Sequence, residues 1–352
     1  DMAAFYAANG FLLYAGAYSE YAHTVNAVPH MLNLGVPQPW ADEGSEGTNL
    51  QKNSYFDALA EEGYGIRVYQ SSYITYCDHS AVAICNEFRI ADLEPIADSA
   101  MPIGDKASTI VHGFLSLSGV ALTVTSYYDR AAAYSGIWGL EWPVVDLRNR
   151  SLTIPVGALT AFDALVSDLR QAQPGEAYFA HLLLPHYPYA LNSDCSIRPV
   201  SEWKPRKSAV GGLEERQVAY AEQVRCAMAK VDEALTALAE APGGDRFIAI
   251  IHGDHGSRIT QYDPTSEALG QFTDEDVIAS YSTLFAVRAE GIEDGIEHSR
   301  VPAAEILKSL ATSEFASASV TLPADFVHSV MLGYRSSEPA HSYPLPEAWT
   351  DQ

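Results

Sequence analysis

Two short apolar runs with a long amphipathic segment between them constrain the fold of this chain more than any other feature. Residues 177–184 and 247–251 are apolar almost throughout, which is typical of strands buried on both faces of a parallel sheet. Between them, apolar side chains recur at helical spacing over residues 224–238, and the pattern ends at Pro242-Gly243-Gly244. A strand, a helix and a second strand in this order predict a parallel sheet covered by helices.

The rest of the chain supplies further elements of both kinds. The pattern predicts helices at residues 1–9, from about residue 24, and at 54–62, 159–169 and 301–310, and strands at 11–14, 64–70 and 281–287. We therefore expect an α/β fold with a mainly parallel central sheet and helices on both faces. Residues 71–150 are irregular and rich in aromatic residues, and we predict that they form an insertion or lid.

The charge balance limits the partners of the chain. Its 21 Lys and Arg residues stand against 45 Asp and Glu residues, which gives a formal net charge of −24. Contacts with nucleic-acid phosphates require clustered Lys and Arg, and the sequence has no such cluster. We therefore expect neither a nucleic-acid partner nor a basic membrane-binding patch. A small or neutral substrate, a bound cation, or a saline or extracytoplasmic setting remains compatible.

Four cysteines are present, and none of them forms a CxxC pair, which argues against a zinc ribbon or a thioredoxin-like site. Four buried thiols are one interpretation. The even number and the polar surroundings favour two disulfides, Cys77–Cys85 and Cys195–Cys226, and hence an oxidising compartment.

The ends of the chain and its most apolar stretch bear on membrane association. The stretch at residues 110–124 is too short and too often interrupted by polar residues to span a bilayer. No signal peptide is visible at the start of the sequence. Because the chain begins in the middle of the helix predicted at residues 1–9, we expect that an upstream segment has been removed.

The first cluster of reactive residue types follows the second apolar run directly. His252-Gly253-Asp254-His255-Gly256 places a carboxylate and an imidazole side by side, between glycines that allow a sharp turn. Both side chains bind cations such as Zn²⁺, and ligands collect at the carboxyl ends of parallel strands. We therefore predict that Asp254 and His255 bind a metal ion, although an ordinary turn uses the same residues.

A second cluster lies where the first apolar run ends, at Pro185. His181 lies inside the run, and a single strand histidine is more often a core residue than a ligand. His186 lies between two prolines and beside two tyrosines, of which Tyr189 is the second. His186 is therefore the stronger candidate for contact with a metal or an anionic group.

Thr24 lies at the predicted start of a helix. A hydroxyl in this place is first of all a helix N-cap. The same place suits a nucleophile, because the helix N-terminus favours an alkoxide and a bound phosphate, and a metal ion would lower the pKa of the hydroxyl. Thr24 is therefore a candidate for either role.

Taken in chain order, Thr24, the His186-Tyr-Pro-Tyr strand exit and the Gly253-Asp254-His255-Gly256 turn resemble the alkaline phosphatase/sulfatase superfamily. The closer resemblance is to its membrane-anchored sulfatase-like branch, which includes lipoteichoic acid synthases and phosphoethanolamine transferases. It extends from about residue 5 to about residue 315. The resemblance implies a single sulfatase-like catalytic domain over residues 1–352, with 71–150 as its insertion.

The resemblance also implies a metal site. Thr24 matches the metal-bound nucleophile of the family, and Asp254 and His255 match its metal-ligating pair. We expect one divalent ion, with Zn²⁺ or Mn²⁺ favoured over Mg²⁺ or Ca²⁺ by the imidazole in the ligand set.

Substrate contacts follow from the same resemblance. His186 matches a catalytic histidine that contacts the transferred phosphate group, and His181 matches a second histidine of the transferase subgroup. Together with Tyr189 they are the predicted substrate-binding residues. The surroundings of Cys195 and Cys226 also resemble extracytoplasmic relatives whose cysteines pair.

Two departures from the family pattern matter. Sulfatases that use formylglycine carry Cys or Ser followed by xPxR, whereas this chain reads Thr24-Val-Asn-Ala-Val, so we do not expect sulfate-ester hydrolysis through this residue. The family also places a metal-binding Asp or Glu after a first strand, well before the nucleophile. Asp1 and Glu20 are the only earlier carboxylates, so we expect that strand, like any membrane anchor, to lie outside this chain.

These expectations combine into an extracytoplasmic, metal-dependent enzyme. It would transfer a phosphoryl or phosphodiester group to a lipid or glycan hydroxyl of the cell envelope, with membrane attachment through segments outside this chain. Two alternatives stay open: a phosphoester hydrolase, and a non-catalytic sensing or glycan-binding ectodomain with an incomplete metal site. The oligomeric state is not predicted.

Overall fold

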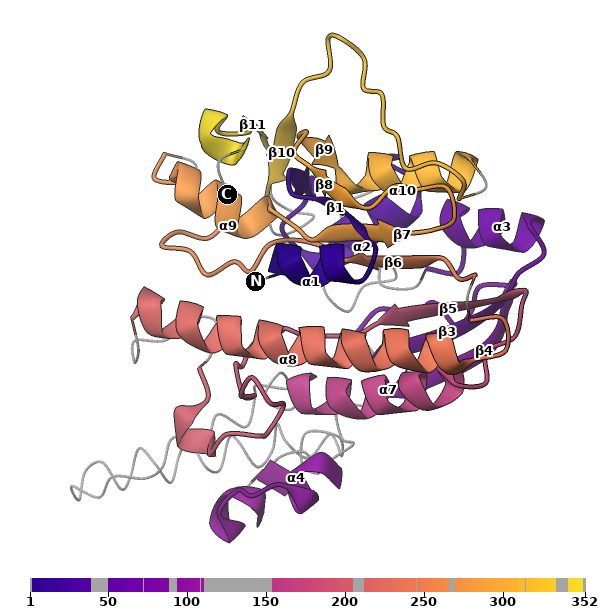
Figure 1. Cartoon of the computed structure of the whole chain (residues 1–352). Coiled ribbons are helices and arrows are strands. Elements are labelled where there is room, and N and C mark those ends of the chain that lie inside the picture. The colour runs from indigo at the N-terminus through magenta and orange to yellow at the C-terminus, as the bar shows by residue number, and fades with distance from the viewer. Residues whose placement is uncertain are drawn as a thin grey trace. The chain divides into compact units, whose positions relative to one another are not determined.

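The computed structural model of the chain divides into two compact units (Figure 1). It describes residues 2–38, 50–71, 73–88, 94–107, 109–110, 154–204, 212–244, 246–265, 270–313, 315–333 and 341–350. The first unit comprises Asp1–Asn86, Leu169–Ala180 and Ala237–Gln352. The second comprises Glu87–Asp168 and His181–Thr236.

The first unit carries the described strands, apart from the last residues of two of them. The strands are β1 (Leu12–Tyr14), β2 (Ala17–Tyr18), β3 (Gly65–Ser71), β4 (Val82–Phe88), β5 (Glu176–His181), β6 (Ala249–His252), β7 (Phe285–Arg288), β8 (Gly295–Glu297), β9 (Val301–Pro302), β10 (Ser329–Leu332) and β11 (His341–Pro344). Its helical segments are α1 (Met2–Ala8), α2 (Thr24–Leu32), α3 (Ser54–Glu61), α9 (Asp274–Tyr281), α10 (Ala303–Thr312) and the 3-10 helix η5 (Glu347–Thr350).

The largest described sheet has the strand order β6-β7-β1-β8. β7 runs antiparallel to both β6 and β1, whereas β1 and β8 are parallel, so three of the four strands share one direction. The expected α/β class is confirmed, with more mixed pairing than predicted. β7 and β8 are joined only by residues 289–294, and a connection this short reverses the chain, whereas parallel neighbours need a long crossover. The other described sheets have the orders β4-β3-β5, β2-β9 and β10-β11.

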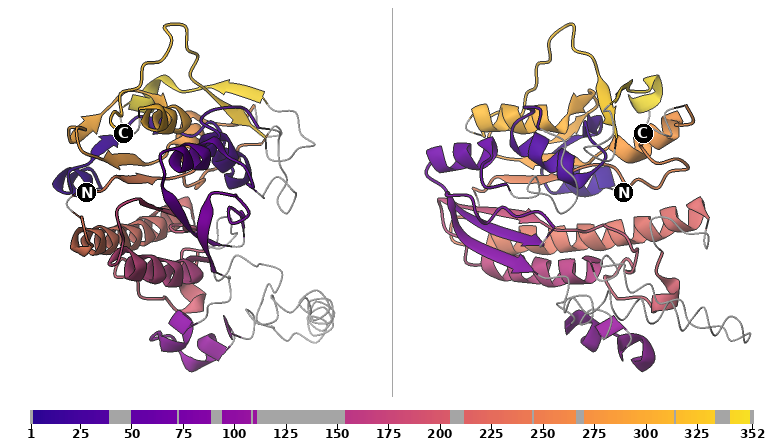
Figure 2. Two further views of the ribbon diagram at one scale, coloured as in Figure 1. Left: turned by 90° about the vertical axis from the view of Figure 1, so that its right-hand side faces the viewer. Right: turned by 180° about the vertical axis from the view of Figure 1, so that it is seen from behind.

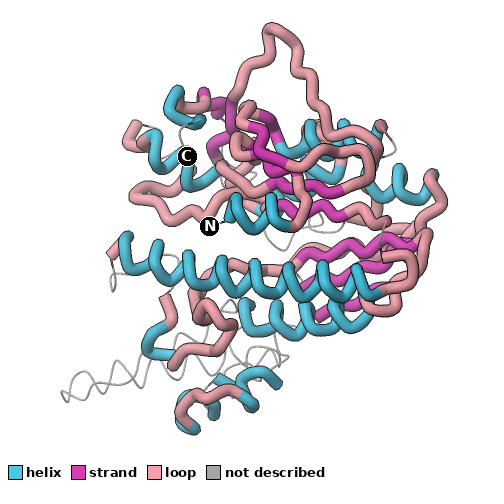
Figure 3. The backbone as a smooth tube through the Cα atoms, viewed as in Figure 1, coloured by secondary structure: helices cyan, strands magenta, loops and turns pink. Residues whose placement is uncertain are grey.

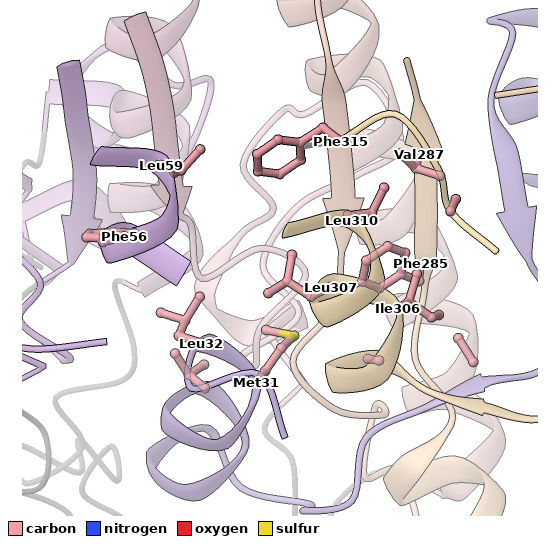
Figure 4. Packing of buried hydrophobic residues seen from close by; sticks show 14 of the residues in the cluster. Met31, Leu32, Phe56, Leu59, Phe285, Val287, Ile306, Leu307, Leu310 and Phe315 are labelled. Atoms are coloured by element: carbon pink, nitrogen blue, oxygen red, sulfur yellow. The ribbon is translucent and has the colours of Figure 1, made fainter. Parts of the chain in front are cut away.

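The core of the first unit lies between this sheet and its helices. All nine residues of α2 are buried, and α10 buries Ile306, Leu307 and Leu310 along one face. Figure 4 shows these two helices contributing side chains to one cluster with Phe285 of β7. Each fully buried aliphatic or aromatic side chain of this kind contributes about 1.5–3 kcal/mol. The start of α2 is therefore firmly anchored.

Most predicted elements of the first unit are confirmed to within a few residues, with three differences. The strand predicted at 281–287 begins only at Phe285, because Tyr281 still belongs to α9. The strand predicted at 177–184 ends at His181, ahead of Pro185, which has no N–H to donate to a ladder. β5 and β6 were expected at the centre of a sheet but lie at the edges of the described sheets, with half-buried residues.

The second unit is built mainly from helices. Its described helices include α4 (Glu94–Asp98), α7 (Ile154–Leu169), α8 (Leu213–Glu240) and the 3-10 helix η3 (Val200–Glu202). α7 and α8 lie side by side in all views (Figure 2), and Lys230 of α8 donates to Asp163 of α7 over 3.0 Å. The chain between β5 and η3 is irregular and is drawn as loop in Figure 3.

Both predicted disulfides, Cys77–Cys85 and Cys195–Cys226, are present, so the interpretation as buried thiols is wrong. The second bond ties the loop after β5 to α8. Cross-links of this kind typically stabilise a fold by about 2–4 kcal/mol.

The predicted insertion at 71–150 is described only in part. Its described residues form the Cys77–Cys85 loop, β4, α4 and the short segments at 99–107 and 109–110, and residues 111–150 lie outside the described part. Among the helices that the structure describes, none combines the length and the apolar character that crossing a bilayer requires.

Candidate active site

Residues 253–256 form a turn after β6, and main-chain hydrogen bonds attach this turn to the residues around the end of α9. The Gly253 N–H donates to the Leu284 carbonyl over 2.9 Å, and the Gly256 N–H donates to the Ser280 carbonyl over 2.9 Å. The two side chains between these glycines, Asp254 and His255, are therefore presented from a backbone that is fixed at both ends.

The glycines are required because neighbouring atoms approach closely. A Cβ atom on Gly256 would lie 2.4 Å from the Ala279 carbonyl oxygen and 2.7 Å from the Ser280 carbonyl carbon. A Cβ atom on Gly253 would lie 2.5 Å from the Thr283 hydroxyl. This packing is the physical reason for the glycines that the sequence places on either side of the Asp-His pair.

The ring of His255 is oriented by its main chain. Its Nδ1 lies 2.7 Å from the Gly256 carbonyl oxygen, which can only accept a hydrogen bond. Nδ1 therefore carries the proton, and Nε2 of the neutral ring carries the acceptor lone pair, the arrangement usual in metal-binding histidines. The Asp254 carboxylate accepts the His255 N–H through Oδ1 over 3.0 Å, and its Oδ2 lies 3.5 Å from His255 Nε2.

The hydroxyl of Thr24 lies beside Nε2 of His255. Its Oγ1 lies 3.1 Å from His255 Nε2, and the residue is only 7% exposed. The N-cap of α2 is His23, with no capping hydrogen bond from its side chain, and Thr24 is the first helical residue. The interpretation of Thr24 as an N-cap is therefore wrong, and its hydroxyl faces the Asp-His turn.

These three side chains form a donor set that fits a divalent ion. Ligands at about 2.0–2.1 Å from a tetrahedral Zn²⁺ lie about 3.3 Å apart, close to the two separations measured from His255 Nε2. A carboxylate, an imidazole and a hydroxyl are also chemically suited to such an ion. Across the described part of the chain, no group of three or more His, Cys, Asp or Glu residues gathers as a metal site.

Two further residues border the site: Tyr76, which the sequence did not point to, and His252, which opens the predicted cluster but was given no role. Tyr76 is fully buried, and burial raises the pKa of its phenol well above the usual value, with a further increase from the charge of Asp254. Burial lowers the pKa of His252, against the opposing effects of its bond to the Gly253 carbonyl and of Asp254, and its ring stacks on Phe285. Tyr76 is far from Asp254 in sequence, and no spacing rule would have connected them.

Two strands precede Thr24: β1 has no acidic residue at its end, and β2 is followed by Ser19 and Glu20. β1 lies inside the four-stranded sheet and is followed by Ala15 and Gly16, where a Cβ atom on Gly16 would lie 2.3 Å from the Ser299 carbonyl oxygen. Glu20, the acidic residue closest to Thr24 in sequence, instead contacts His30 Nε2 over 2.5 Å.

The other predicted site residues belong to the second unit. His181 is the last residue of β5, and His186 lies in the loop that follows. Tyr189 is 1% exposed, and its ring packs edge to face against Tyr220 of α8. The structure thus places Tyr189 in the interior of its unit, and its predicted contact with substrate stays a prediction.

No protein-family model and no curated protein matches the sequence, whereas solved structures do match its fold. BT33494S-sulf from Bacteroides thetaiotaomicron, from work on the metabolism of multiple glycosaminoglycans, aligns with 96% of this chain and 74% of its own at 12% identity and a TM-score of 0.52. The C-terminal periplasmic domain of EcEptC from Escherichia coli, in complex with Zn, aligns with 97% of this chain and 84% of its own at 10% identity and a TM-score of 0.50. The chain has the alkaline phosphatase/sulfatase fold.

At these identities the similarity shows the fold alone. The 2-O GAG sulfatase BT1596 also aligns, at 14% identity and a TM-score of 0.49, and the chain spans 65% of its length. Within the alkaline phosphatase/sulfatase fold of this chain, Asp254 and His255 follow the carboxyl end of β6, where ligands of α/β sheets usually bind.

Proposed function

We propose that the chain is a metal-dependent phosphoryl- or phosphodiester-transfer domain in which Thr24 is the nucleophile. The observation that carries this proposal is the 3.1 Å contact between Thr24 Oγ1 and His255 Nε2, in place of a capping bond. A threonine held on a fully buried helix, facing an Asp-His turn, has the placement of an activated nucleophile.

The proposed reaction uses the hydroxyl of Thr24 directly. Its oxygen attacks phosphorus as its proton passes to solvent, the bond from phosphorus to the leaving alcohol breaks, and the leaving oxygen takes up a proton from solvent. A second alcohol then attacks the phospho-Thr24 group and frees the threonine. The positive end of α2 favours the negative charge that develops at Thr24. A bound divalent ion would lower the pKa of the hydroxyl and neutralise phosphate charge.

We propose Asp254, His255 and Thr24 as the ligands of that ion, with Zn²⁺ or Mn²⁺ favoured. Replacing Asp254 by Ala is expected to reduce bound metal from about one ion per chain to nearly none, since losing a charged ligand removes a large part of the affinity. Elemental analysis of the purified protein measures this. Replacing the exposed Asp294 by Ala is the matched control, and unchanged metal content in the Asp254 variant would refute the ligand assignment.

The proposed substrate is a phosphate-bearing lipid or glycan outside the cytoplasm. Two disulfides support an oxidising compartment. The matching EcEptC domain is periplasmic, and BT33494S-sulf comes from work on glycosaminoglycans. The net charge of −24 does not conflict with this substrate, because the bound cation and the histidines would supply positive charge locally.

Trapping the covalent intermediate tests the proposal. Metal-loaded protein is mixed with a phosphodiester, quenched in acid and digested, and mass spectrometry is expected to locate a phosphate-containing adduct on Thr24. Chelator-treated protein should show none. Turnover with no adduct on Thr24, or an adduct on a different residue, would show that Thr24 is not the nucleophile.

Two alternatives use the same fold. Water in place of the second alcohol would make the chain a hydrolase, which product analysis with and without an acceptor alcohol distinguishes. A non-catalytic binding domain is favoured by one observation, namely that no third acidic or imidazole ligand joins Asp254 and His255 among the described residues. Absence of both metal and turnover would support that reading.

A further inference from the structure

Gln223 of α8 is completely buried and uses both ends of its side-chain amide on one loop. Its Oε1 accepts the main-chain N–H groups of Ala190 and Leu191 over 3.0 and 3.2 Å. Its Nε2 donates to the His186 carbonyl over 2.6 Å. The orientation of the amide is fixed by these partners, because only the oxygen can accept and only the nitrogen can donate.

In addition to the main chain of His186, its imidazole ring is fixed by contacts with Tyr187. Nδ1 lies 2.5 Å from the carbonyl oxygen of Tyr187, to which it can only donate, and the two rings stack with centroids 4.1 Å apart. In the protonated imidazole Nε2 is then the nitrogen that can donate to a phosphate oxygen. The hydrogen bond that the Gln223 side chain donates to the His186 carbonyl fixes the main chain from which this ring projects.

A second attachment lies one helical turn further along α8. Cys226 forms its disulfide with Cys195, and residues three apart on a helix share a face. The loop is thus held to one face of α8 at both of its ends. The disulfide holds the loop at Cys195, whereas the side chain of Gln223 forms a hydrogen bond with His186 itself.

We propose that Gln223 is a positioning residue that fixes His186 for contact with the phosphate group of the substrate. The inference rests on the proposed function and on the phosphate contact that the family resemblance predicts for His186. A glutamine is needed because the loop offers two donors and one acceptor to the same side chain. An ionised glutamate of the same shape can meet the donors at Ala190 and Leu191 but cannot donate to His186.

Replacing Gln223 by Glu therefore breaks the His186 bond selectively. Binding of inorganic phosphate, measured by calorimetry on the full chain, is expected to weaken about tenfold, as the loss of one buried hydrogen bond implies. In a His186→Ala background the same change is expected to have no further effect, because residues that act through one another are not additive. Gln217→Glu, the same substitution at an exposed position of α8, is the matched control.

Three results would overturn the inference: phosphate binding unchanged in Gln223→Glu, an equal loss with and without His186, or no phosphate binding by the wild type. If Gln223→Glu does not fold, Gln223→Met keeps the volume without a charge and must show the same dependence on His186. Intact phosphate binding without turnover or adduct would instead count against the proposed function alone.

Discussion

Replacing Thr24 by Val is expected to reduce the kcat/KM for phosphodiester turnover by about 10⁴-fold or more, the size of effect seen when a nucleophile is removed. Valine keeps the shape of threonine and removes only the hydroxyl that faces His255 Nε2. The fold should survive, with a cost of about 1 kcal/mol for the lost hydrogen bond. Steady-state kinetics, together with thermal unfolding of the same sample, measure both effects.

Two variants make this result specific. Thr24→Ser keeps the hydroxyl and is expected to retain measurable turnover. Thr260→Val removes another buried hydroxyl of the first unit, one that donates to the Arg258 carbonyl over 3.5 Å, and should leave the rate unchanged. If Thr24→Val turned over as fast as the wild type, the hydroxyl would have no part in the reaction.

Replacing Gly256 by Ala is expected to destabilise the first unit by about 3 kcal/mol or more, the upper range for overpacking. The new methyl group would lie 2.4 Å from the Ala279 carbonyl oxygen, which belongs to the backbone of a helix and cannot rotate away. The Asp-His turn would shift as well, so metal binding should weaken. Urea unfolding and elemental analysis measure the two effects.

A graded series of glycines provides the comparison. Gly253→Ala meets the Thr283 side chain at 2.5 Å, so a smaller loss is expected, and a second change of Thr283 to Ala should restore part of it. Gly270→Ala meets nothing within 4 Å and should be neutral. Equal stability of the Gly253 and Gly256 variants would show that the turn is more adaptable than its packing suggests.

The sequence predicts the elements of this fold where the local pattern is strong. The helix at 54–62 and the strand at 64–70 correspond to α3 and β3, because a clear apolar period is closed by Gly63. Edge positions and strand directions could not be predicted, since they depend on partners far away in the chain. The pairing of Leu13 with both Ala286 and Ile296 has no local signal.

The candidate site was predictable in the same uneven way. Thr24, Asp254 and His255 could be proposed because each lies at the end of a recognisable element, and the structure brings their side chains together. Gln223 and Tyr76 could not, since a buried amide or phenol in an apolar pattern looks like any other core position. Their partners are set by packing, which local patterns do not encode.

The burial of every residue in α2 also limits how this protein could be re-engineered. In a library that varies the residues around Thr24, most variants would lose stability because the core would no longer pack. Few substitutions there would therefore leave the fold intact for selection on activity. Changes in substrate preference are better sought in exposed segments, such as residues 319–327 of the loop between α10 and β10 that Figure 3 shows, most of which are exposed.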